Sequence, residues 1–371
     1  MEQKVIFNGQ VFTLTRFWAT EEPCLWITDH SRSRCLKWSL WGPDEYCIFL
    51  KNLTETELAQ ITSLDGAPLD VREELRQFLT GKDNPMALQD KKIMPPPWMA
   101  FPEIERYSIG WRMGYGEDYI YRFGDWLDTL SPDERTEYRT LFPEPVTWKG
   151  WWDEEDSSEV LEHGDFWVNA WQPEGSPKYT RQWLQQEFSM GRKQELCLFW
   201  GHQPAEDGQL TKSCLSQWWM EDFWSVANTY LCMEQYMMAG KAELFGDQEI
   251  REQILKCSDP KQIKALGRKV RGFDQKVWDK FKYAIVLNGN WCKFSQNRNL
   301  REFLLSTGDS VLAEASPYDN IWGIRLAASS PEAQDPMKWR GQNLLGFALM
   351  EVRDELRRVT QNEMLCDWNA V

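Results

Sequence analysis

Glu234 and Lys241 are the pair of residues whose types and spacing most directly indicate chemistry. They lie seven residues apart within residues 233–242, so two helical turns separate them and both belong to one face of a predicted helix. A structural ion pair on an otherwise apolar face explains this spacing. The functional interpretation is that burial lowers the pKa of Lys241 and makes its amine a nucleophile, while Glu234 exchanges protons. Spacing alone leaves both interpretations open.

Three further segments combine polar residues, Trp and Gly at predicted loop-to-helix junctions: residues 290–297, 314–323 and 339–346. Such junctions present free backbone N–H groups at which an anion or a sugar can bind. Taken singly, each segment is equally well explained as a turn or a helix cap.

The order of these motifs resembles the NADAR superfamily, the NAD- and ADP-ribose-associated domains related to the YbiA-like N-glycosidases. The resemblance spans about residues 196–360 and does not cover residues 1–190. The motifs that carry it are Phe199-Trp200-Gly201-His202, Glu234-Gln235-Tyr236 with Lys241-Ala242, Leu266-Gly267-Arg268, Trp278, Lys293-Phe294-Ser295-Gln296-Asn297, Thr307-Gly308-Asp309, Glu314-Ala315-Ser316-Pro317, Asp319, Trp322-Gly323, and Trp339 with Gly341 and Asn343-Leu344-Leu345-Gly346.

The resemblance implies a mainly helical hydrolase that cleaves the N-glycosidic bond between a ribose and a base. Removal of ADP-ribose from guanine in nucleic acid, a reversal of DNA ADP-ribosylation, is the expected activity. Two alternatives stay open: hydrolysis of phosphorylated riboflavin-pathway intermediates, and a non-catalytic module that binds ADP-ribose or a nucleotide. The expected partners are an ADP-ribosylated base or a phosphorylated ribosyl substrate, and a modified nucleic acid. We expect no cofactor, no metal and no membrane association.

Motif matching to the family places Glu234, Lys241 and Asp319 at catalytic positions. The predicted substrate-binding residues are Gly201, His202, Trp278, Lys293, Ser316, Trp322, Gly323 and Asn343. The sequence departs from the family pattern at Arg325, where a small residue, often Gly, is expected. We interpret Arg325 as a residue that narrows the pocket or contacts a phosphate.

The physical chemistry of the expected reaction agrees with these residue types. Breaking a ribosyl C1–N bond develops oxocarbenium character at C1, which a carboxylate from Asp319 or Glu234 stabilises. A neutral Lys241 can instead attack C1 and, after ring opening, hold the sugar as a Schiff base while a carboxylic acid protonates the departing base. Asn343, at the start of the last predicted helix, is placed to bind phosphate or hydroxyl groups.

The elements that must position these residues are predicted to form an α+β protein with three regions. Residues 1–97 are a β-rich region with short helices and a Pro-rich linker, residues 98–190 an acidic, aromatic region of unknown role, and residues 191–371 the mainly α-helical NADAR-like domain. The strands are expected at residues 4–8, 11–18, 25–28, 35–41 and 46–50. Short helices are expected to open at Thr54 and to span residues 71–79. The helices of the last region are expected at residues 230–245, 247–257, 259–267, 273–287, 299–305 and 342–359.

Charge is distributed unevenly over the 371 residues, whose formal net charge is −15. Residues 1–190 hold 19 Lys and Arg against 33 Asp and Glu, whereas residues 251–301 hold 13 basic against 4 acidic residues. The acidic first half weakens the case for broad affinity for nucleic acid, because such binding depends on phosphate neutralisation. The local basic excess favours a phosphorylated ligand, although solvated helix faces also explain it.

Cysteine and histidine usage excludes some classes of site. The nine cysteines form no C-x-x-C pair and fit reduced thiols, and three histidines are too few for a histidine-rich metal centre. The first residues carry Glu2 and Lys4 where a signal sequence has an apolar core, and we expect a cytoplasmic protein. Most of the 22 tryptophans are expected to pack in aromatic cores, and some to stack on a planar ligand.

Overall fold

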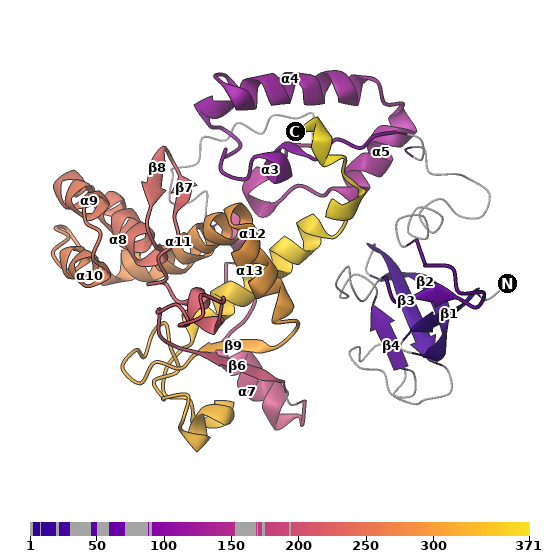
Figure 1. The fold of residues 1–371 in the computed structure, drawn as a ribbon. Helices are drawn as coiled ribbons and strands as arrows, with labels where there is room; N and C mark the ends of the chain where they lie inside the picture. The colour runs from indigo at the N-terminus through magenta and orange to yellow at the C-terminus, as the bar shows by residue number, and fades with distance from the viewer. Residues whose placement is uncertain are drawn as a thin grey trace. The chain divides into compact units, whose positions relative to one another are not determined.

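The computed structural model describes residues 3–7, 9–19, 22–29, 46–49, 59–70, 88, 91–152, 168, 170–172, 175–192 and 194–371 (Figure 1). The chain groups into two compact units, which are described separately. The first comprises Met1–Pro95, Asp125–Leu141 and Gln361–Val371, and the second comprises Pro96–Gly124 and Phe142–Thr360. The predicted division after residues 97 and 190 stays a prediction, because proximity does not test whether a segment folds alone.

A five-stranded antiparallel sheet forms the N-terminal part of the first unit, in the order β4-β3-β2-β1-β5. Its strands are β1 (Gln3–Phe7), β2 (Gln10–Ala19), β3 (Glu22–Asp29), β4 (Tyr46–Phe49) and β5 (Thr62–Ser63). Val5 and Phe7 alternate with more exposed neighbours and are buried with Phe12, which lies opposite Val5 in the register. The first, second, third and fifth predicted strands are therefore confirmed. The strand predicted at residues 35–41 and the short helices predicted from Thr54 and at residues 71–79 lie outside the described residues.

Helix α5 (Pro132–Leu141) of the same unit begins with a reciprocal capping box. The Glu134 N–H donates to Ser131 Oγ at 3.3 Å, and the Ser131 N–H donates to Glu134 Oε2 at 2.6 Å. Tyr138, on the buried face of the helix, donates from its hydroxyl to the Met94 carbonyl at 2.7 Å. The short 3₁₀ helices that follow residue 361 are Glu363–Leu365 and Trp368–Ala370.

Helices dominate the second unit, and two short strand pairs accompany them, so the predicted α+β class is confirmed. The α-helices are α3 (Pro97–Ala100), α4 (Tyr115–Asp128, which continues into the first unit), α7 (Arg181–Ser189), α8 (Met233–Leu244), α9 (Gln248–Leu255), α10 (Pro260–Gly267), α11 (Gln275–Gln296), α12 (Arg298–Ser306) and α13 (Leu344–Thr360). The 3₁₀ helices are Ile109–Trp111, Val146–Trp148, Lys212–Leu215, Pro331–Gln334 and Pro336–Lys338. The strands are β6 (Leu196–Phe199) parallel to β9 (Val311–Glu314), and β7 (Phe223–Ser225) antiparallel to β8 (Asn228–Tyr230).

Helix α11 continues past residue 287, where the sequence predicted its end. The prediction of a loop-to-helix junction at residues 290–297 is therefore wrong as far as Gln296. Asn288 and Gly289 lie just past the predicted end and both face α8: the Asn288 amide donates to the Tyr236 hydroxyl at 2.8 Å. A Cβ at Gly289 would lie 2.5 Å from the Tyr236 ring. Packing against α8 therefore explains why Asn288 and Gly289 lie within this helix, although both residue types have a low intrinsic helix propensity.

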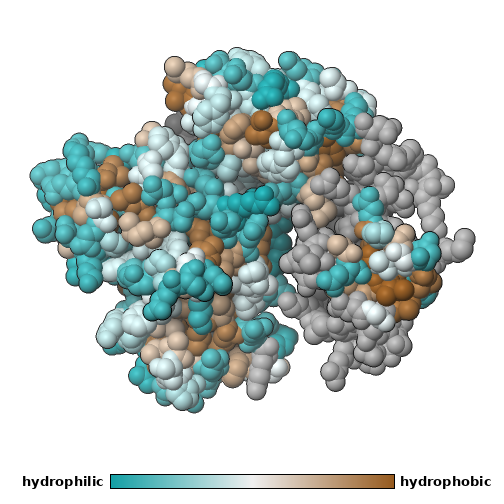
Figure 2. All heavy atoms as spheres, in the orientation of Figure 1, coloured by the Kyte–Doolittle hydropathy of each residue, from teal (hydrophilic) through white to brown (hydrophobic). Residues whose placement is uncertain are grey.

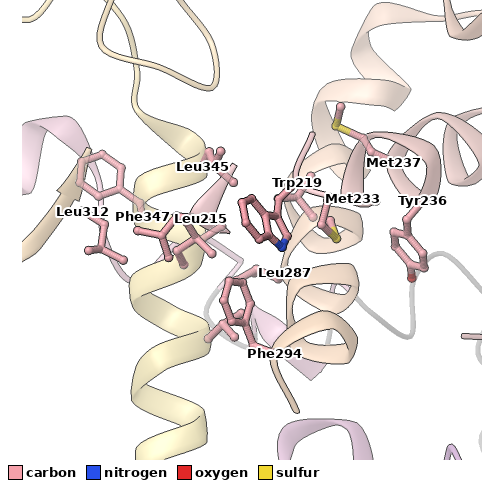
Figure 3. Packing of buried hydrophobic residues seen from close by; sticks show 14 of the residues in the cluster. Leu215, Trp219, Met233, Tyr236, Met237, Leu287, Phe294, Leu312, Leu345 and Phe347 are labelled. Atoms are coloured by element: carbon pink, nitrogen blue, oxygen red, sulfur yellow. The ribbon is translucent and has the colours of Figure 1, made fainter. Parts of the chain in front are cut away.

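The hydrophobic core of the second unit lies where α8, α11 and α13 meet the β6–β9 pair. Figure 3 shows side chains of α11 and α13 meeting around Leu215 and Trp219. Leu287, Phe294 and Phe347 are fully buried there. At the surface, Figure 2 shows mostly hydrophilic atoms over α9 and α10, with small hydrophobic patches between them. This core carries the elements that line the cavity described below.

Tryptophans of the predicted middle region pack against one another within the second unit. Trp148 lies with its ring centroid 5.4 Å from that of Trp98, 5.7 Å from Trp111 and 5.1 Å from Trp151. Trp98 and Trp148 are buried. These four residues fit the expected aromatic core packing.

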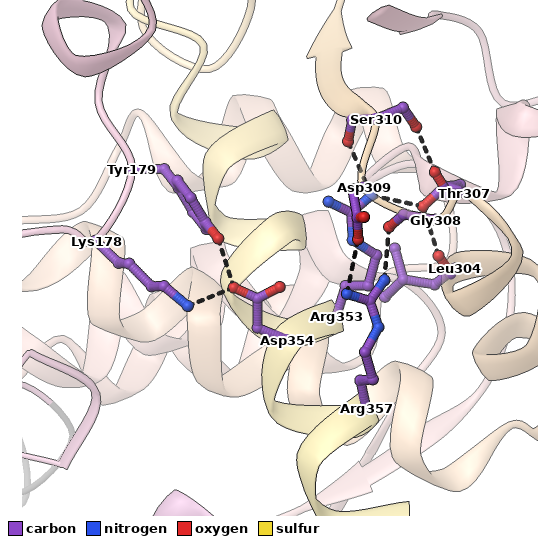
Figure 4. A network of polar contacts seen from close by, with 10 residues as sticks. All are labelled: Lys178, Tyr179, Leu304, Thr307, Gly308, Asp309, Ser310, Arg353, Asp354 and Arg357. Carbon is purple, nitrogen blue, oxygen red and sulfur yellow. Dashed lines mark hydrogen bonds and ion pairs between the residues drawn. The ribbon is translucent and has the colours of Figure 1, made fainter. Parts of the chain in front are cut away.

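Carboxyl groups of helix α13 hold the segment that precedes β6. Glu351 accepts hydrogen bonds from the Lys178 N–H at 2.9 Å and from the Tyr283 hydroxyl at 2.8 Å. On the same helix, Asp354 accepts from Lys178 and Tyr179, and Arg353 donates to the turn that precedes β9 (Figure 4). Residues 175–192 pack against helix α13 and contribute to the core of the second unit. They therefore belong to the same packed body as the predicted helical domain.

No helix in the described parts of the chain combines the length and the apolar character that crossing a membrane requires.

Replacing Leu184 by Ala tests whether α7 is part of this core. Leu184 is 1 % exposed and packs in the core cluster, so the Leu184→Ala variant is expected to lose about 2–5 kcal/mol of unfolding free energy in chemical denaturation. Met190, which follows the last residue of α7 and is exposed, provides the control, and Met190→Ala is expected to unfold like the wild type. Equal stability of all three proteins would separate α7 from the core.

Candidate active site

A cavity of about 730 Å³ opens in the second unit, and its volume is in the range typical of small-molecule sites. Elements far apart in the sequence build it: the loops after β6 and β9, the segment before β7, and helices α8, α10 and α11. The lining residues are Trp200, Gly201, His202, Gln203, Ser216, Trp218, Glu234, Met237, Met238, Lys241, Lys264, Gly267, Arg268, Trp278, Glu314, Ser316, Tyr318, Asp319, Asn320, Ile321 and Trp322. All three predicted catalytic residues and five predicted substrate-binding residues therefore face one space.

Glu234 lies in the first turn of α8 and is 2 % exposed. Its Oε2 accepts a hydrogen bond from the Trp218 indole N–H at 3.2 Å, whereas Oε1 is buried without a partner among the described residues. Burial raises the pKa of Glu234, and the Lys264 ammonium opposes the rise. The side chain is therefore a buried carboxyl group with an unused oxygen beside the cavity.

Glu314, the last residue of β9, is a second carboxyl group of this kind. Its Oε2 is buried and has no hydrogen-bond partner in the described part of the chain. Burial raises the pKa of Glu314 to about 8, and the neighbouring Asp319 carboxylate adds to the rise. Glu314 is consequently mostly protonated at neutral pH, a state suited to proton donation.

Asp319 is held in one orientation by the loop that follows β9. Its Oδ1 accepts the backbone N–H groups of Ile321 at 2.9 Å and of Trp322 at 2.8 Å. The Asp319 N–H donates to Ser316 Oγ at 3.3 Å. This loop thus fixes a carboxylate beside the two buried carboxyl groups.

Lys241 forms no ion pair with Glu234, although both are described and lie on the same helix. Its Nζ instead donates to the Gly267 carbonyl at 3.0 Å and lies 4.1 Å from the centroid of the Phe273 ring and 5.7 Å from that of Trp278. Burial lowers the pKa of Lys241, which increases the fraction of neutral amine. The structural ion pair is therefore absent, and the role of Lys241 as a nucleophile stays a prediction.

Two cations on α10 and just after it also line the cavity. Lys264 and Arg268 are four residues apart, one helical turn, and neither forms an ion pair with any residue that the structure describes. The Lys264 ammonium lies 5.6 Å from the centroid of the Trp218 ring. Their charges are therefore available to an anionic ligand.

Aromatic rings form much of the remaining wall. Trp218, Trp278 and Trp322 are half-buried, and the His202 ring lies 5.4 Å from that of Trp218. Gly201, at φ +87°, turns the chain sharply after β6, where a side chain would be strained. Flat surfaces of this kind suit a planar base.

Lys293, Gly323 and Asn343 do not line the cavity, and their predicted contact with substrate stays a prediction. Each supports a cavity wall. The Lys293 ammonium, 0 % exposed, donates to the carbonyls of Cys214 at 2.7 Å and Ser216 at 3.2 Å, and burial lowers its pKa to about 8.

Asn343 and Gly323 hold the end of β9 in place. Asn343 accepts the Glu314 N–H at 3.0 Å and donates to the Leu312 carbonyl at 2.9 Å. A Cβ at Gly323 would lie 2.8 Å from the Glu314 carbonyl oxygen, so only glycine fits there. Both residues therefore position Glu314.

Arg325 is exposed and does not line the cavity, so the interpretation that it narrows the pocket is not supported. Its φ of +56° lies in the left-handed region. This backbone conformation explains why a glycine is expected at the position.

The site residues that the sequence did not single out are Glu314, Lys264 and Arg268. Glu314 and Arg268 lie within motifs of the resemblance, and Lys264 lies in the basic stretch, but no spacing rule indicates that they face Glu234. Among the described residues, no group of three or more His, Cys, Asp or Glu is arranged to hold a metal ion.

A concave site with buried carboxyl groups, unpaired cations and aromatic walls is typical of an enzyme that acts on a charged ligand with a planar group. The chain belongs to the NADAR domain family, which matches residues 198–357. It is 46 % identical over 156 residues to "N-glycosidase R617" of Acanthamoeba polyphaga mimivirus, and the matched region covers 41 % of this chain and 92 % of that protein. It is 33 % identical over 135 residues to "N-glycosidase Npun_R5314" of Nostoc punctiforme, and the matched region covers 36 % of this chain and 80 % of that protein.

A solved structure is also similar, the NMR structure of the E. coli protein YbiA. That match has 25 % sequence identity and a TM-score of 0.36, and it covers 44 % of this chain and 86 % of that one. The predicted family is therefore confirmed by the family match and the sequence relatives.

Replacing Gly267 by Ala tests the packing that brings α10 to the cavity. A Cβ at Gly267 would lie 2.0 Å from Met238 Sδ and 2.8 Å from its Cγ, so either the Met238 side chain must repack or α10 must move away from α8. The Gly267→Ala variant is expected to lose about 1–3 kcal/mol of unfolding free energy in chemical denaturation. Gly124, in α4, has open space around it, so Gly124→Ala is expected to be at least as stable as the wild type. A fully stable Gly267→Ala protein would show that this contact does not constrain the position of α10.

Proposed function

We propose that this chain hydrolyses the N-glycosidic bond that joins ADP-ribose to guanine in nucleic acid. As a member of the NADAR family with relatives named N-glycosidases, the chain is a hydrolase that acts on N-glycosyl bonds. The observation that carries the finer proposal is the cavity in which Glu234, Glu314, Asp319 and Lys241 converge with two unpaired cations.

Glu314 is the proposed general acid. When the bond between C1 of the ribose and the base nitrogen breaks, its electron pair goes to the nitrogen, which takes the proton from the Glu314 carboxyl group. The raised pKa supports this role, because the proton is present near pH 7. Glu234, whose pKa is also raised by burial, is the second candidate for the same transfer.

Asp319 is the proposed electrostatic stabiliser. Positive charge develops at C1 as the base departs, and a carboxylate already fixed by two backbone N–H groups needs little reorganisation to stabilise it. The removal of one such preorganised group typically costs about 10²–10³ in kcat.

Lys241 distinguishes two routes for the second half of the reaction. In one, water adds to C1 and gives its proton to the carboxylate that has protonated the base. In the other, the neutral amine adds to C1, the ribose ring opens, an imine forms, and water then hydrolyses the imine to release ADP-ribose and free lysine. The lowered pKa of Lys241 supports the second route.

Lys264 and Arg268 are the proposed partners of the diphosphate. A guanidinium and an ammonium one helical turn apart can each contact phosphate oxygens, and the aromatic wall leaves flat surfaces for a base. A phosphorylated riboflavin-pathway intermediate carries fewer phosphates, and no feature of the cavity favours it.

Substrate identity is tested by offering the full chain two compounds, guanosine carrying ADP-ribose on its base and a phosphorylated ribosylaminopyrimidine. We expect mass spectrometry to detect released ADP-ribose and guanosine at many turnovers per protein, and slower or no cleavage of the pyrimidine. The Asp319→Asn variant is expected to be at least about 10²-fold slower in kcat. Preferential cleavage of the pyrimidine would transfer the assignment to the riboflavin pathway, and binding of ADP-ribose without turnover would indicate a non-catalytic reader.

The Schiff-base route is tested by adding borohydride during turnover. We expect a stable sugar adduct on Lys241, identified by peptide mass spectrometry, and none in Lys241→Ala or Lys241→Arg, because a guanidinium stays protonated and cannot attack. Lys280, on the surface, provides the control, and Lys280→Arg is expected to trap normally. An active wild type without any adduct, together with an active Lys241→Ala variant, would assign the water route.

A further inference from the structure

Trp200 and Tyr318 line the cavity and yet remain largely in water. Tyr318 is 85 % exposed and Trp200 is 55 % exposed, whereas Trp218, Trp278 and Trp322 in the same lining are half-buried. These two rings therefore mark the outer edge of the cavity, which we call the aromatic rim.

The strand pairing explains why the two rim residues share one edge. Strands β6 and β9 are parallel, and Phe199 lies opposite Glu314 in their register. Trp200 follows Phe199 directly, and Tyr318 lies in the loop that follows Glu314; the Ala315 N–H donates to the Phe199 carbonyl at 2.8 Å. The carboxyl ends of neighbouring parallel strands thus place both residues at the same edge of the cavity that Glu314 lines.

Core packing does not explain why large aromatic residues occupy these two positions. Neither Trp200 nor Tyr318 belongs to the core of the second unit, and neither side chain forms a hydrogen bond with a residue that the structure describes. Two large aromatic side chains at the edge of a ligand cavity are positioned to contact the part of a ligand that extends out of it.

We propose that the aromatic rim binds a nucleobase next to the modified guanine in single-stranded nucleic acid. The inference rests on the proposed function, because it assigns the remainder of the same substrate. Bases of a single strand have free faces, and stacking on an exposed aromatic ring tolerates any base. In a duplex, the flanking bases stack on one another and leave no face for the rim.

The charges around the rim agree with a polyanionic ligand. Lys264 and Arg268 line the same cavity without ion-pair partners among the described residues, and burial keeps the Glu314 carboxyl group mostly neutral near pH 7. The cavity therefore repels a phosphate backbone less than the overall charge of −15 suggests. The proposed contact with nucleic acid is therefore short and local, and it does not require a broad affinity of the acidic chain for phosphates.

The test compares the wild type with the double variant Trp200→Ala, Tyr318→Ala on two substrates. These are guanosine carrying ADP-ribose and a single-stranded pentanucleotide with the same modified guanine at its centre. We expect kcat/KM of the double variant to fall at least about tenfold more on the pentanucleotide than on the nucleoside. Tyr107, which is 71 % exposed and does not line the cavity, provides the control, and Tyr107→Ala is expected to match the wild type on both. Equal losses on the two substrates would overturn the proposal.

A binding measurement separates this proposal from the proposed function. Fluorescence anisotropy of a labelled, unmodified single-stranded pentanucleotide is expected to show weaker binding by the double variant than by the wild type and Tyr107→Ala. If the wild type hydrolyses neither substrate, the proposed function fails, and the anisotropy result still decides the rim. Equal binding by all three proteins, or tighter binding of a duplex of the same sequence, would overturn the rim proposal.

Discussion

The withdrawal of two carboxyl groups from water is the constraint on which the site depends. Glu234 and Glu314 each have one buried oxygen without a partner among the described residues, and burial raises both pKa values. A carboxylate in this position would lack the solvation that water provides, so the protonated form is favoured. The same desolvation lowers the pKa of Lys241. A single physical effect therefore favours the protonated form of the two carboxyl groups and the neutral form of the amine.

The rest of the second unit maintains this arrangement. Asn343 ties the start of α13 to β9 and so fixes Glu314, while the close approach of Gly267 to Met238 brings α10 against α8. Lys293 binds two carbonyls of the segment that leads to Trp218, and the indole of that residue donates to Glu234. Buried polar side chains thus hold backbone segments in place rather than contacting a ligand. The second unit also includes segments outside the family match, since α13 holds residues 178 and 179.

Local patterns predicted a large share of this structure. Runs of β-forming residues between short turns indicated the strands that contain Val5 and Phe12. The motifs indicated that Glu234, Lys241 and Asp319 act together. Other features depend on contacts between distant residues. A glycine stands at position 289 within α11 because the Tyr236 ring occupies the space that a side chain would need. The roles of Glu314, Lys264 and Arg268 likewise depend on how α8, α10 and β9 are oriented toward the cavity. Spacing along the chain does not specify that orientation.

The protonation state of Glu314 is the most direct test of the account, and it requires no substrate. Infrared difference spectroscopy between the wild type and Glu314→Gln, recorded across a pH titration, isolates the carboxyl band of this one residue. We expect a protonated carboxyl band at pH 7 that disappears with a midpoint near pH 8, because burial raises the pKa of Glu314 to about 8. A folded wild type in which this carboxyl group is already ionised at pH 6 would contradict the proposed acid and the desolvation on which the site depends.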